Sequence, residues 1–259
     1  MDKFFFPDSV VVEGVSSSHT NLARRILSNL KRFGFRGRVY AAGPRPEEVE
    51  GFKLYKSVLD IEDEIDLAIV LTPAAVVPQI AEECGKKGIK RMLIESGGFG
   101  EFEGDGSPTE KKLVEVCRRY GIRFIGPNCR GIVNRENGLV TPFARMLERF
   151  VKGGLSVIAQ SGGVGASILM DMTLEFVGVT KFVSFGNAVD VKEHDLINYL
   201  SSDADTEVIA AYLEGVSDGR RLLETASRVR KPIVMLKSNR RQSSKKIACS
   251  HSAALAGDD

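Results

Sequence analysis

The chain has 259 residues, 43% hydrophobic and 27% charged, which is enough for one large α/β domain or two ordinary ones with a substantial core. Its 36 basic and 34 acidic residues give a net charge of +2, without the large basic excess that is typical of nucleic-acid-binding proteins. The four cysteines have no C-x-x-C spacing, and no apolar run has the length of a signal-peptide core or a membrane-spanning helix. We therefore expect a cytoplasmic protein with no disulfide framework, metal site, nucleic-acid partner or membrane association.

The first half of the chain alternates strand-like and helix-like segments. Short β-rich or apolar runs predict strands at 9–13, 38–42, 66–71, 90–95 and 122–125. Segments with helical character predict helices at 21–33, 74–87 and 108–120. This alternation indicates a doubly wound, mostly parallel sheet with right-handed crossovers, which we assign to residues 1–133.

The rhythm breaks at residues 134–153, which contain Asn137-Gly138, Thr141-Pro142 and Gly153-Gly154. We interpret this segment as a linker with irregular structure. A second alternating series follows, with strands predicted at 155–159, 181–185, 208–213 and 232–237 and helices at 164–176, 193–200 and 219–229. The sequence therefore predicts a second α/β domain over residues 154–259.

Ligands of open parallel sheets bind beyond the carboxyl ends of the strands, near the point where the strand order reverses. In the first domain these ends carry small, flexible or hydroxylated residues whose backbone N–H groups suit a phosphate. The candidates are Gly14, Ser16, Ser17, Ser18, Arg45, Thr72, Pro73, Ser96, Gly97 and Asn128. The second strand ends in Gly43-Pro44-Arg45 rather than in an acidic residue, and an arginine suits a phosphorylated ribose. This disfavours NAD and leaves NADP and coenzyme A open.

In the second domain, Ser161-Gly162-Gly163 joins a predicted strand to a predicted helix, and such a turn favours an anion. Glu214 ends the strand two β units later, at the same predicted edge. His251 follows a polar, cationic run at 237–246 and precedes small residues. A neutral imidazole on such a loop is nucleophilic, and Glu214 is placed to accept its second ring proton.

Three other residues compete for a chemical role. His19 lies in the first phosphate turn, where it lines a ligand or faces solvent, and His194 is expected on an exposed helix start. No two histidines have a helical metal-ligand spacing. Cys129 has no base nearby in sequence, so we interpret it as a small structural residue rather than a nucleophile.

Several ordered motifs carry a resemblance to a known family. They are Asn29-Leu30 to Gly37-Arg38-Val39-Tyr40, Asp66-Leu67-Ala68, Gly98-Phe99, Gly126-Pro127-Asn128-Cys129, Gln160-Ser161-Gly162, Ser184-Phe185-Gly186-Asn187, Tyr212-Leu213-Glu214-Gly215 and Ser250-His251. With them the chain resembles, over nearly its whole length, the α subunit or α portion of nucleoside-diphosphate-forming acyl-CoA synthetases, related to succinyl-CoA synthetase. The resemblance implies a Rossmann-like CoA-binding domain followed by a flavodoxin-like, succinyl-CoA synthetase-like α/β domain.

The resemblance also implies a reaction. Family members convert acyl-CoA, phosphate and ADP into carboxylate, CoA and ATP through an acyl phosphate and a phosphohistidine. Here His251 would carry the phosphoryl group, Glu214 would support it, and the amides of Ser161, Gly162 and Gly163 would hold phosphate. Coenzyme A would bind the first domain, and ATP or ADP with Mg would bind an ATP-grasp β partner in a hetero-oligomer.

The chain departs from the family pattern at three places. Ser250-His251-Ser252-Ala253-Ala254 lacks the usual glycine, Ala42-Gly43-Pro44-Arg45-Pro46 replaces Pro-x-Asn-Pro-Lys, and relatives continue beyond residue 259 with at least another helix and strand. We therefore expect this sequence to be a shortened α portion. The alternative is a non-catalytic CoA-binding regulatory module, such as the front part of a protein acyltransferase. NADP-dependent oxidoreduction is disfavoured because no Tyr-x-x-x-Lys constellation is present.

Overall fold

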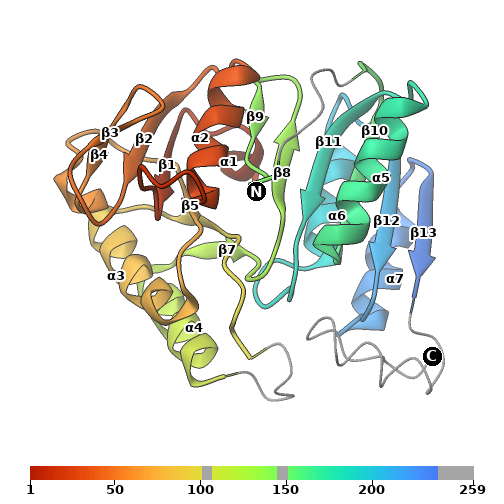
Figure 1. The fold of residues 1–259 in the computed structure, drawn as a ribbon. Helices are drawn as coiled ribbons and strands as arrows, with labels where there is room; N and C mark the ends of the chain where they lie inside the picture. The colour runs from red at the N-terminus through yellow and green to blue at the C-terminus, as the bar shows by residue number, and fades with distance from the viewer. Residues whose placement is uncertain (101–106, 145–150, 239–259) are drawn as a thin grey trace.

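A computed structural model describes residues 1–100, 107–144 and 151–238 (Figure 1). It contains two α/β units side by side, each with a mostly parallel sheet between helices, as the sequence predicts. None of the helices in these described ranges is long and apolar enough to cross a membrane.

The first sheet has the strand order β3-β4-β2-β1-β5-β6-β7. The parallel strands are β1 (Ser9–Glu13), β2 (Arg38–Ala42), β4 (Phe52–Tyr55), β5 (Leu67–Val70), β6 (Arg91–Ile94) and β7 (Arg123–Ile125), and β3 (Glu48–Val49) runs antiparallel to β4 at the edge. Because β2 and β5 flank β1 on opposite sides, the strand order reverses at β1. The carboxyl ends of β1 and β5 are therefore the expected ligand edge.

Helices cover both faces of this sheet. Helix α2 (Leu22–Arg32) buries Ile26, Leu27 and Leu30 in one apolar cluster, and the Asn21 side chain caps it by accepting from the Arg24 N–H at 2.8 Å. Helices α3 (Val77–Lys87) and α4 (Pro108–Tyr120) pack into a second cluster on the other face. Short α1 (Asp2–Phe5), η1 (Val58–Asp60) and η2 (Ala74–Val76) complete the unit.

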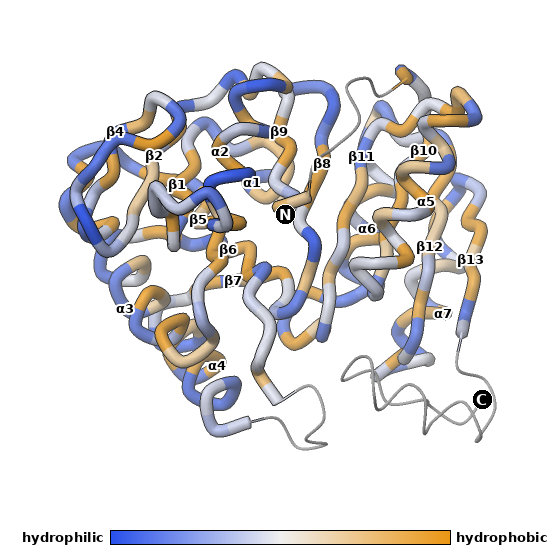
Figure 2. Tube along the Cα trace, in the orientation of Figure 1, coloured by the Kyte–Doolittle hydropathy of each residue, from blue (hydrophilic) through white to orange (hydrophobic). Residues whose placement is uncertain are grey.

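The second sheet has the strand order β13-β12-β10-β11-β8-β9. Its parallel strands are β10 (Leu155–Ala159), β11 (Val179–Ser184), β12 (Val208–Leu213) and β13 (Ile233–Lys237). Helix α5 (Gly162–Leu174) packs on one face, and α6 (Glu193–Ser202) and α7 (Gly219–Arg228) pack on the other. Figure 2 shows the apolar residues concentrated along the strands and the inner helix faces.

The segment expected to be an irregular linker differs from that expectation. Strands β8 (Gly131–Asn134) and β9 (Leu139–Val140) form a hairpin, and β8 pairs antiparallel with β11 of the second sheet. Asn137-Gly138, which we interpreted as a break, lies in the turn of this hairpin, where Gly138 has a φ of +75°. The second sheet therefore begins at residue 131, before the predicted domain boundary.

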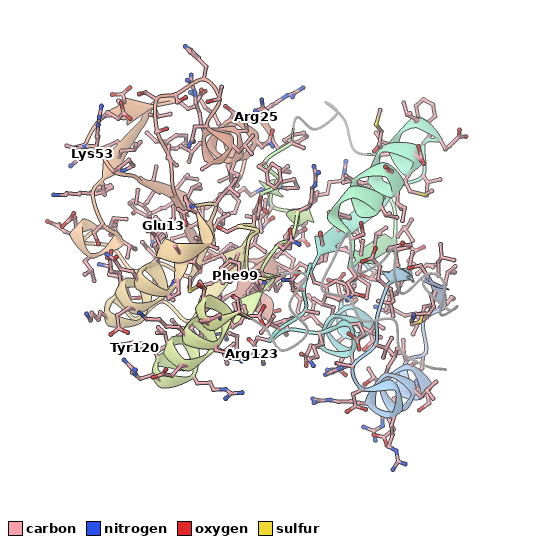
Figure 3. The ribbon with its side chains drawn as sticks, turned by 60° about the horizontal axis from the view of Figure 1, so that its bottom comes forward. Glu13, Arg25, Lys53, Phe99, Tyr120 and Arg123 are labelled. Carbon is pink, nitrogen blue, oxygen red and sulfur yellow. The ribbon has the colours of Figure 1, made fainter. Side chains whose placement is uncertain are left out.

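The N-terminal residues, for which we predicted no helix, help to join the two units. Phe4 and Phe5 of α1 are fully buried in an apolar cluster that includes residues of both sheets. The Phe5 ring stacks on Tyr199 of α6 with centroids 4.5 Å apart. In a second contact between the units, Arg123 of β7 (Figure 3) donates its Nε–H to both carboxylate oxygens of Asp190 at 2.9 Å. Asp190 follows β11 of the second sheet. These contacts join the first unit to the second.

Candidate functional site

A cavity of about 880 Å³ lies between the two units, where residues from both line its wall. The first unit and the β8–β9 segment contribute Glu95, Asn128, Arg130 and Phe143. The second contributes Ser161, Gly162, Gly163, Asn187 and Glu214, among others. The predicted phosphate turn and the predicted supporting acid therefore share one cavity, although they are more than 50 residues apart in sequence.

The phosphate turn forms the beginning of α5. The Ser161 side chain caps the helix by accepting from the Val164 N–H at 3.3 Å, and the helix starts at Gly162, two residues earlier than predicted. The first N–H groups of a helix point outward from its N-terminal end and have no hydrogen-bond partner within the helix. Gly162 and Gly163 line the cavity, so they bring such N–H groups and the positive end of the helix dipole to it. This arrangement favours an oxyanion such as phosphate.

Gln160 connects the phosphate turn to Glu214. Its Oε1 atom accepts hydrogen bonds from the backbone N–H of Glu214 at 2.8 Å and of Gly215 at 2.9 Å. Strand β10 pairs directly with β12, and the two hydrogen bonds of the Gln160 side chain join the strands again just beyond their paired residues. His251, the predicted nucleophile, lies outside the described residues.

Glu95 is a candidate site residue that the sequence analysis missed. It follows β6, is 3% exposed and lines the cavity. Burial raises the pKa of the Glu95 carboxyl well above its usual range, although Thr141, the Phe143 backbone and the Arg130 guanidinium act in the opposite direction. Burial therefore favours the protonated form of Glu95, which can donate a hydrogen bond. An acidic residue directly after an apolar strand, next to Ser96 and Gly97, was the signal available in the sequence.

The candidate coenzyme residues lie at the carboxyl ends of the first sheet, as predicted from its topology. Gly14 has a φ of +92°, and a Cβ atom there would lie 2.4 Å from the Leu71 oxygen, so only glycine fits between β1 and β5. Ser16 is partly buried, and Ser17, Ser18, Arg45, Pro73 and Gly97 are exposed. These residues leave the turn after β1 open to a ligand.

Two of the candidates are used to brace the strand ends. Ser96 is 1% exposed, and its Oγ accepts from the Thr72 N–H at 2.9 Å. Asn128 lines the cavity between the units, and its side chain donates to Asn187 Oδ1 at 3.3 Å. Ser96 is thus a support for Thr72 rather than an open ligand contact, and Asn128 connects the coenzyme edge with the second unit.

An acid also approaches the first turn, although β2 does not end in one. Glu47, five residues beyond β2, accepts from the Ser17 N–H at 2.9 Å, and this contact with Ser17 lowers the pKa of the Glu47 carboxyl. Glu47 was missed in the sequence because it follows β2 in the chain, and only the folded loop after β2 brings it back to the turn after β1. The Ser17 N–H predicted to bind phosphate is thus occupied by a carboxylate.

The competing residues have structural explanations. His19 is exposed beside Arg24. The expectation that His194 is exposed was wrong, because it is 5% exposed in the first turn of α6. Cys129 is buried with its thiol donating to the Ile94 oxygen at 3.3 Å, and burial raises its pKa well above the usual range, which fits a structural role. Within the described ranges, no group of His, Cys, Asp and Glu side chains could hold a metal ion.

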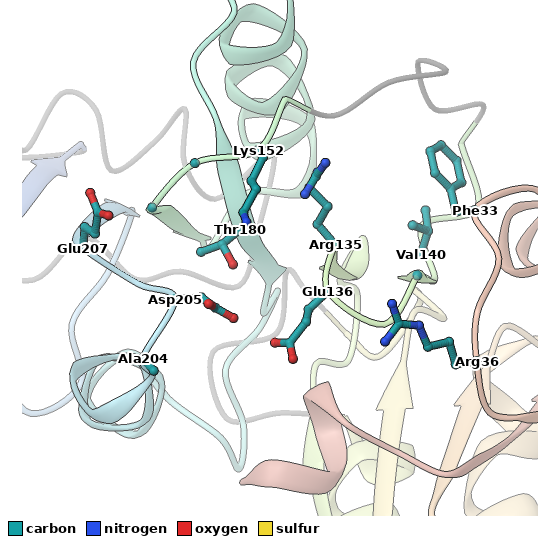
Figure 4. Close-up of a pocket in the computed structure, with 13 residues that line it drawn as sticks. Phe33, Arg36, Arg135, Glu136, Val140, Lys152, Thr180, Ala204, Asp205 and Glu207 are labelled. Atoms are coloured by element: carbon teal, nitrogen blue, oxygen red, sulfur yellow. The ribbon is translucent and has the colours of Figure 1, made fainter.

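A second cavity, of about 840 Å³, lies near the amino ends of β10 and β11 (Figure 4). It contains charges of both signs, including Arg36, Lys152, Glu136 and Asp205. None of the predicted site residues lines it. The cavity between the units is therefore the candidate functional site.

Comparisons with known proteins agree with this division of the chain. Residues 8–135 match the family model of the CoA binding domain, and residues 152–259 match that of the succinyl-CoA ligase like flavodoxin domain. The ADP-forming acetate–CoA ligase of Methanocaldococcus jannaschii is 43% identical over 256 residues, which cover 98% of this chain and 35% of the relative. The alpha subunit of the ADP-forming acetate–CoA ligase II of Pyrococcus furiosus is 41% identical, covering 99% of this chain and 56% of the subunit.

Solved structures show the same architecture. The dinucleotide forming acetyl-coenzyme A synthetase 1 of Ca. Korarchaeum cryptofilum, in complex with phosphate and ADP, superimposes with a TM-score of 0.92 at 33% identity, covering 99% of this chain and 55% of that one. The protein PH0766 from Pyrococcus horikoshii gives a TM-score of 0.86 at 40% identity and covers 58% of that chain. The present chain therefore spans between about a third and a little over half of the length of these proteins.

Proposed function

The chain belongs to the proteins that join a CoA-binding domain to a succinyl-CoA ligase-like flavodoxin domain, and we propose that it is the α part of an ADP-forming acyl-CoA synthetase. The reaction would interconvert acyl-CoA, phosphate and ADP with a carboxylate, CoA and ATP in the cytoplasm. The observation that carries this proposal is the cavity between the units, because a phosphate turn, an acid and the coenzyme edge meet there.

The site residues suit the first chemical step. Phosphate held at Gly162 and Gly163 would attack the thioester carbonyl, so that a carbon–oxygen bond forms, the carbon–sulfur bond breaks and CoA leaves with a proton. Glu95 lies on the same wall, and in its protonated form, which burial favours, it would donate a hydrogen bond to the oxyanion that develops. Positioning and stabilisation of anionic oxygens account for most of phosphoryl-transfer catalysis.

In the second step a ring nitrogen of His251 would attack the phosphorus of the acyl phosphate, so that a phosphorus–nitrogen bond forms, the phosphorus–oxygen bond to the acyl group breaks and the carboxylate leaves. Glu214 would accept a hydrogen bond from the other ring N–H. The Gln160 hydrogen bonds support this assignment, because they fix the backbone that carries Glu214 beside the phosphate turn. The P. furiosus relative is named as a subunit, and we propose a partner subunit with an ATP-grasp domain that binds ADP or ATP with Mg.

Phosphorylation of the protein tests this function. The chain, its partner, magnesium and γ-labelled ATP should give acid-labile, base-stable label that is absent from His251→Ala and reduced in Glu214→Gln. His19→Ala is the matched control and should keep the label, because His19 lies on the first unit. Label that persists in His251→Ala would reject the assignment. CoA binding by calorimetry with no label in any protein would instead support the regulatory module.

A further inference from the structure

Arg130 stands at the start of the β8–β9 segment, and its side chain is held in place along its length. A Cβ atom at Gly162 would lie 2.3 Å from Arg130 Cγ, so the stem passes directly over the phosphate turn. The guanidinium carbon lies 5.0 Å from the centre of the Phe143 ring. The Arg130 backbone N–H donates to Ser184 Oγ at 3.0 Å. Backbone, stem and charged end thus each contact a different neighbour, and two of these neighbours, Gly162 and Phe143, line the cavity between the units.

The charge of Arg130 is not neutralised by a neighbouring carboxylate. Within the described residues, Arg130 forms no ion pair. Its guanidinium lowers the pKa of Glu95, whereas burial raises this pKa well above its usual range and is the larger of the two effects. The cavity therefore holds a fixed cation beside the positive end of α5. Two positive features on one wall repel each other unless an anion lies between them.

We propose that Arg130 is the second half of an oxyanion clamp, in which its guanidinium and the N–H groups of Gly162 and Gly163 hold the same phosphoryl group. A guanidinium is planar and can form a bidentate pair of hydrogen bonds with two phosphate oxygens, whereas an ammonium group cannot. The clamp rests on the proposed function, since it assigns a further ligand to its phosphate. A carboxylate on the acyl group of the substrate would also offer oxyanions to Arg130. The experiment distinguishes this carboxylate from the phosphoryl group as the bound anion.

The test compares Arg130→Met, which keeps the stem over Gly162 and removes the charge, with Arg130→Lys, which keeps the charge and loses the planar fork. In the assembled enzyme, Arg130→Met should raise KM for phosphate by about ten- to a hundredfold, as expected for loss of a charge-assisted contact. Arg130→Lys should lie between Arg130→Met and the wild type. The control Arg36→Met, an exposed arginine at the second cavity, should leave KM for phosphate unchanged.

The substrate arm uses a monocarboxylic and a dicarboxylic acyl-CoA. If Arg130→Met impairs only the dicarboxylic substrate and leaves KM for phosphate unchanged, the phosphoryl clamp is overturned and the guanidinium recognises the substrate carboxylate. If neither parameter changes while CoA binding by calorimetry is normal, Arg130 binds no anion and the inference is rejected.

A measurement without turnover keeps the clamp separate from the proposed function. Broadening of the phosphorus resonance of inorganic phosphate should be seen with the wild type and Arg36→Met and be lost with Arg130→Met. If the wild type forms no phosphohistidine but binds phosphate in a manner that depends on Arg130, the proposed function is rejected and the oxyanion clamp is retained. Equal broadening by the wild type and Arg130→Met would reject the clamp.

Discussion

The side-chain oxygen of Gln160 accepts two hydrogen bonds, at 2.8 and 2.9 Å, from the backbone of Glu214 and the glycine after it. Gln160 is 7% exposed and directly precedes Ser161, so one side chain fixes the distance between the phosphate turn and the acid. The backbone N–H of Gln160 also donates to the Tyr212 oxygen at 2.9 Å, so the backbone and the side chain of one residue both join the end of β10 to the end of β12.

Gln160→Ala should remove the bridge that the Gln160 side chain forms. It leaves two backbone N–H groups without their acceptor, and we expect the free energy of unfolding to fall by about 1–3 kcal/mol. Because Glu214 is then poorly positioned, the rate of histidine phosphorylation should fall at least about tenfold. CoA affinity, measured by calorimetry, should stay unchanged, since the coenzyme edge lies on the other sheet. A normal phosphorylation rate would show that the bridge is dispensable.

Gly162→Ala and Gly163→Ala form a matched pair. A methyl group at Gly162 would lie 2.3 Å from Arg130 Cγ, whereas the closest atom to one at Gly163 is Ser161 Oγ at 4.0 Å. We expect Gly162→Ala to lower the free energy of unfolding by about 1–3 kcal/mol and to weaken phosphate binding. Gly163→Ala should be close to the wild type in denaturant unfolding and in phosphate titration. Equal behaviour of the two variants would contradict the close packing of Arg130 on Gly162.

Glu13, at the end of β1, should make stability depend on pH. Burial, together with the negative charge of Glu83, raises the pKa of Glu13 from 4.5 to about 7. The native state then binds this proton more tightly than the unfolded chain, so the contribution of Glu13 to stability is fully present below pH 4.5 and is lost as the pH rises through 7. Glu13→Gln should remove this loss and stabilise the protein at pH 8 by at most about 3 kcal/mol, with little change at pH 4.

Urea unfolding of the wild type and Glu13→Gln at pH 4, 6 and 8 measures this difference. Glu48→Gln, an exposed acid on the edge strand β3, is the control and should follow the wild type at each pH. A difference between Glu13→Gln and the wild type that does not change with pH would show that Glu13 does not titrate in this range.

Lys181 and Asp203 form a buried ion pair in the second unit. Lys181 is fully buried, and its Nζ atom lies 2.8 and 2.9 Å from the two carboxylate oxygens of Asp203 and 5.2 Å from the centre of the Phe6 ring. Asp203→Ala should lower the free energy of unfolding by up to about 3–5 kcal/mol, because it removes the near carboxylate and leaves the buried cation with the more distant Asp205 Oδ2, at 3.9 Å. Glu115→Ala breaks the exposed pair with Arg119 and should cost at most about 0.5 kcal/mol in the same denaturant titration. Equal losses would contradict the difference in burial.

Glu47 should weaken coenzyme binding in the wild type. Its carboxylate accepts from the Ser17 N–H at the turn where we propose that a phosphate binds. Glu47→Gln keeps a hydrogen-bond acceptor and removes the negative charge that repels a neighbouring anion. The Kd for CoA should therefore fall about three- to tenfold in calorimetry, and less at high salt. A weaker affinity in Glu47→Gln would indicate that the acid binds the coenzyme directly, for instance through a ribose hydroxyl.

Much of the fold followed from local sequence patterns. Strands β1, β10 and β12 and helix α4 have the bounds that the periodicity predicts, because apolar spacing, caps and glycine stops are properties of neighbouring residues. The β8–β9 hairpin, the short β3–β4 pair and α1 were not predicted. Strand β8 is stabilised by β11, and α1 by an apolar cluster from both units, so their partners lie far along the chain. Strands β3 and β4 are only two and four residues long, which leaves a weak local signal as well.

The sequence by itself determined the two α/β units, the phosphate turn at Ser161 and the placement of Glu214 at the same sheet edge, because parallel strands align their carboxyl ends. Only the tertiary structure decided that Glu95 and Arg130 reach this turn from the other unit, and that Glu47 returns to Ser17. Burial in that structure also raises the pKa of Glu95. Burial depends on every element packed around a group, and residues brought together across two sheets leave no pattern in the order of the chain.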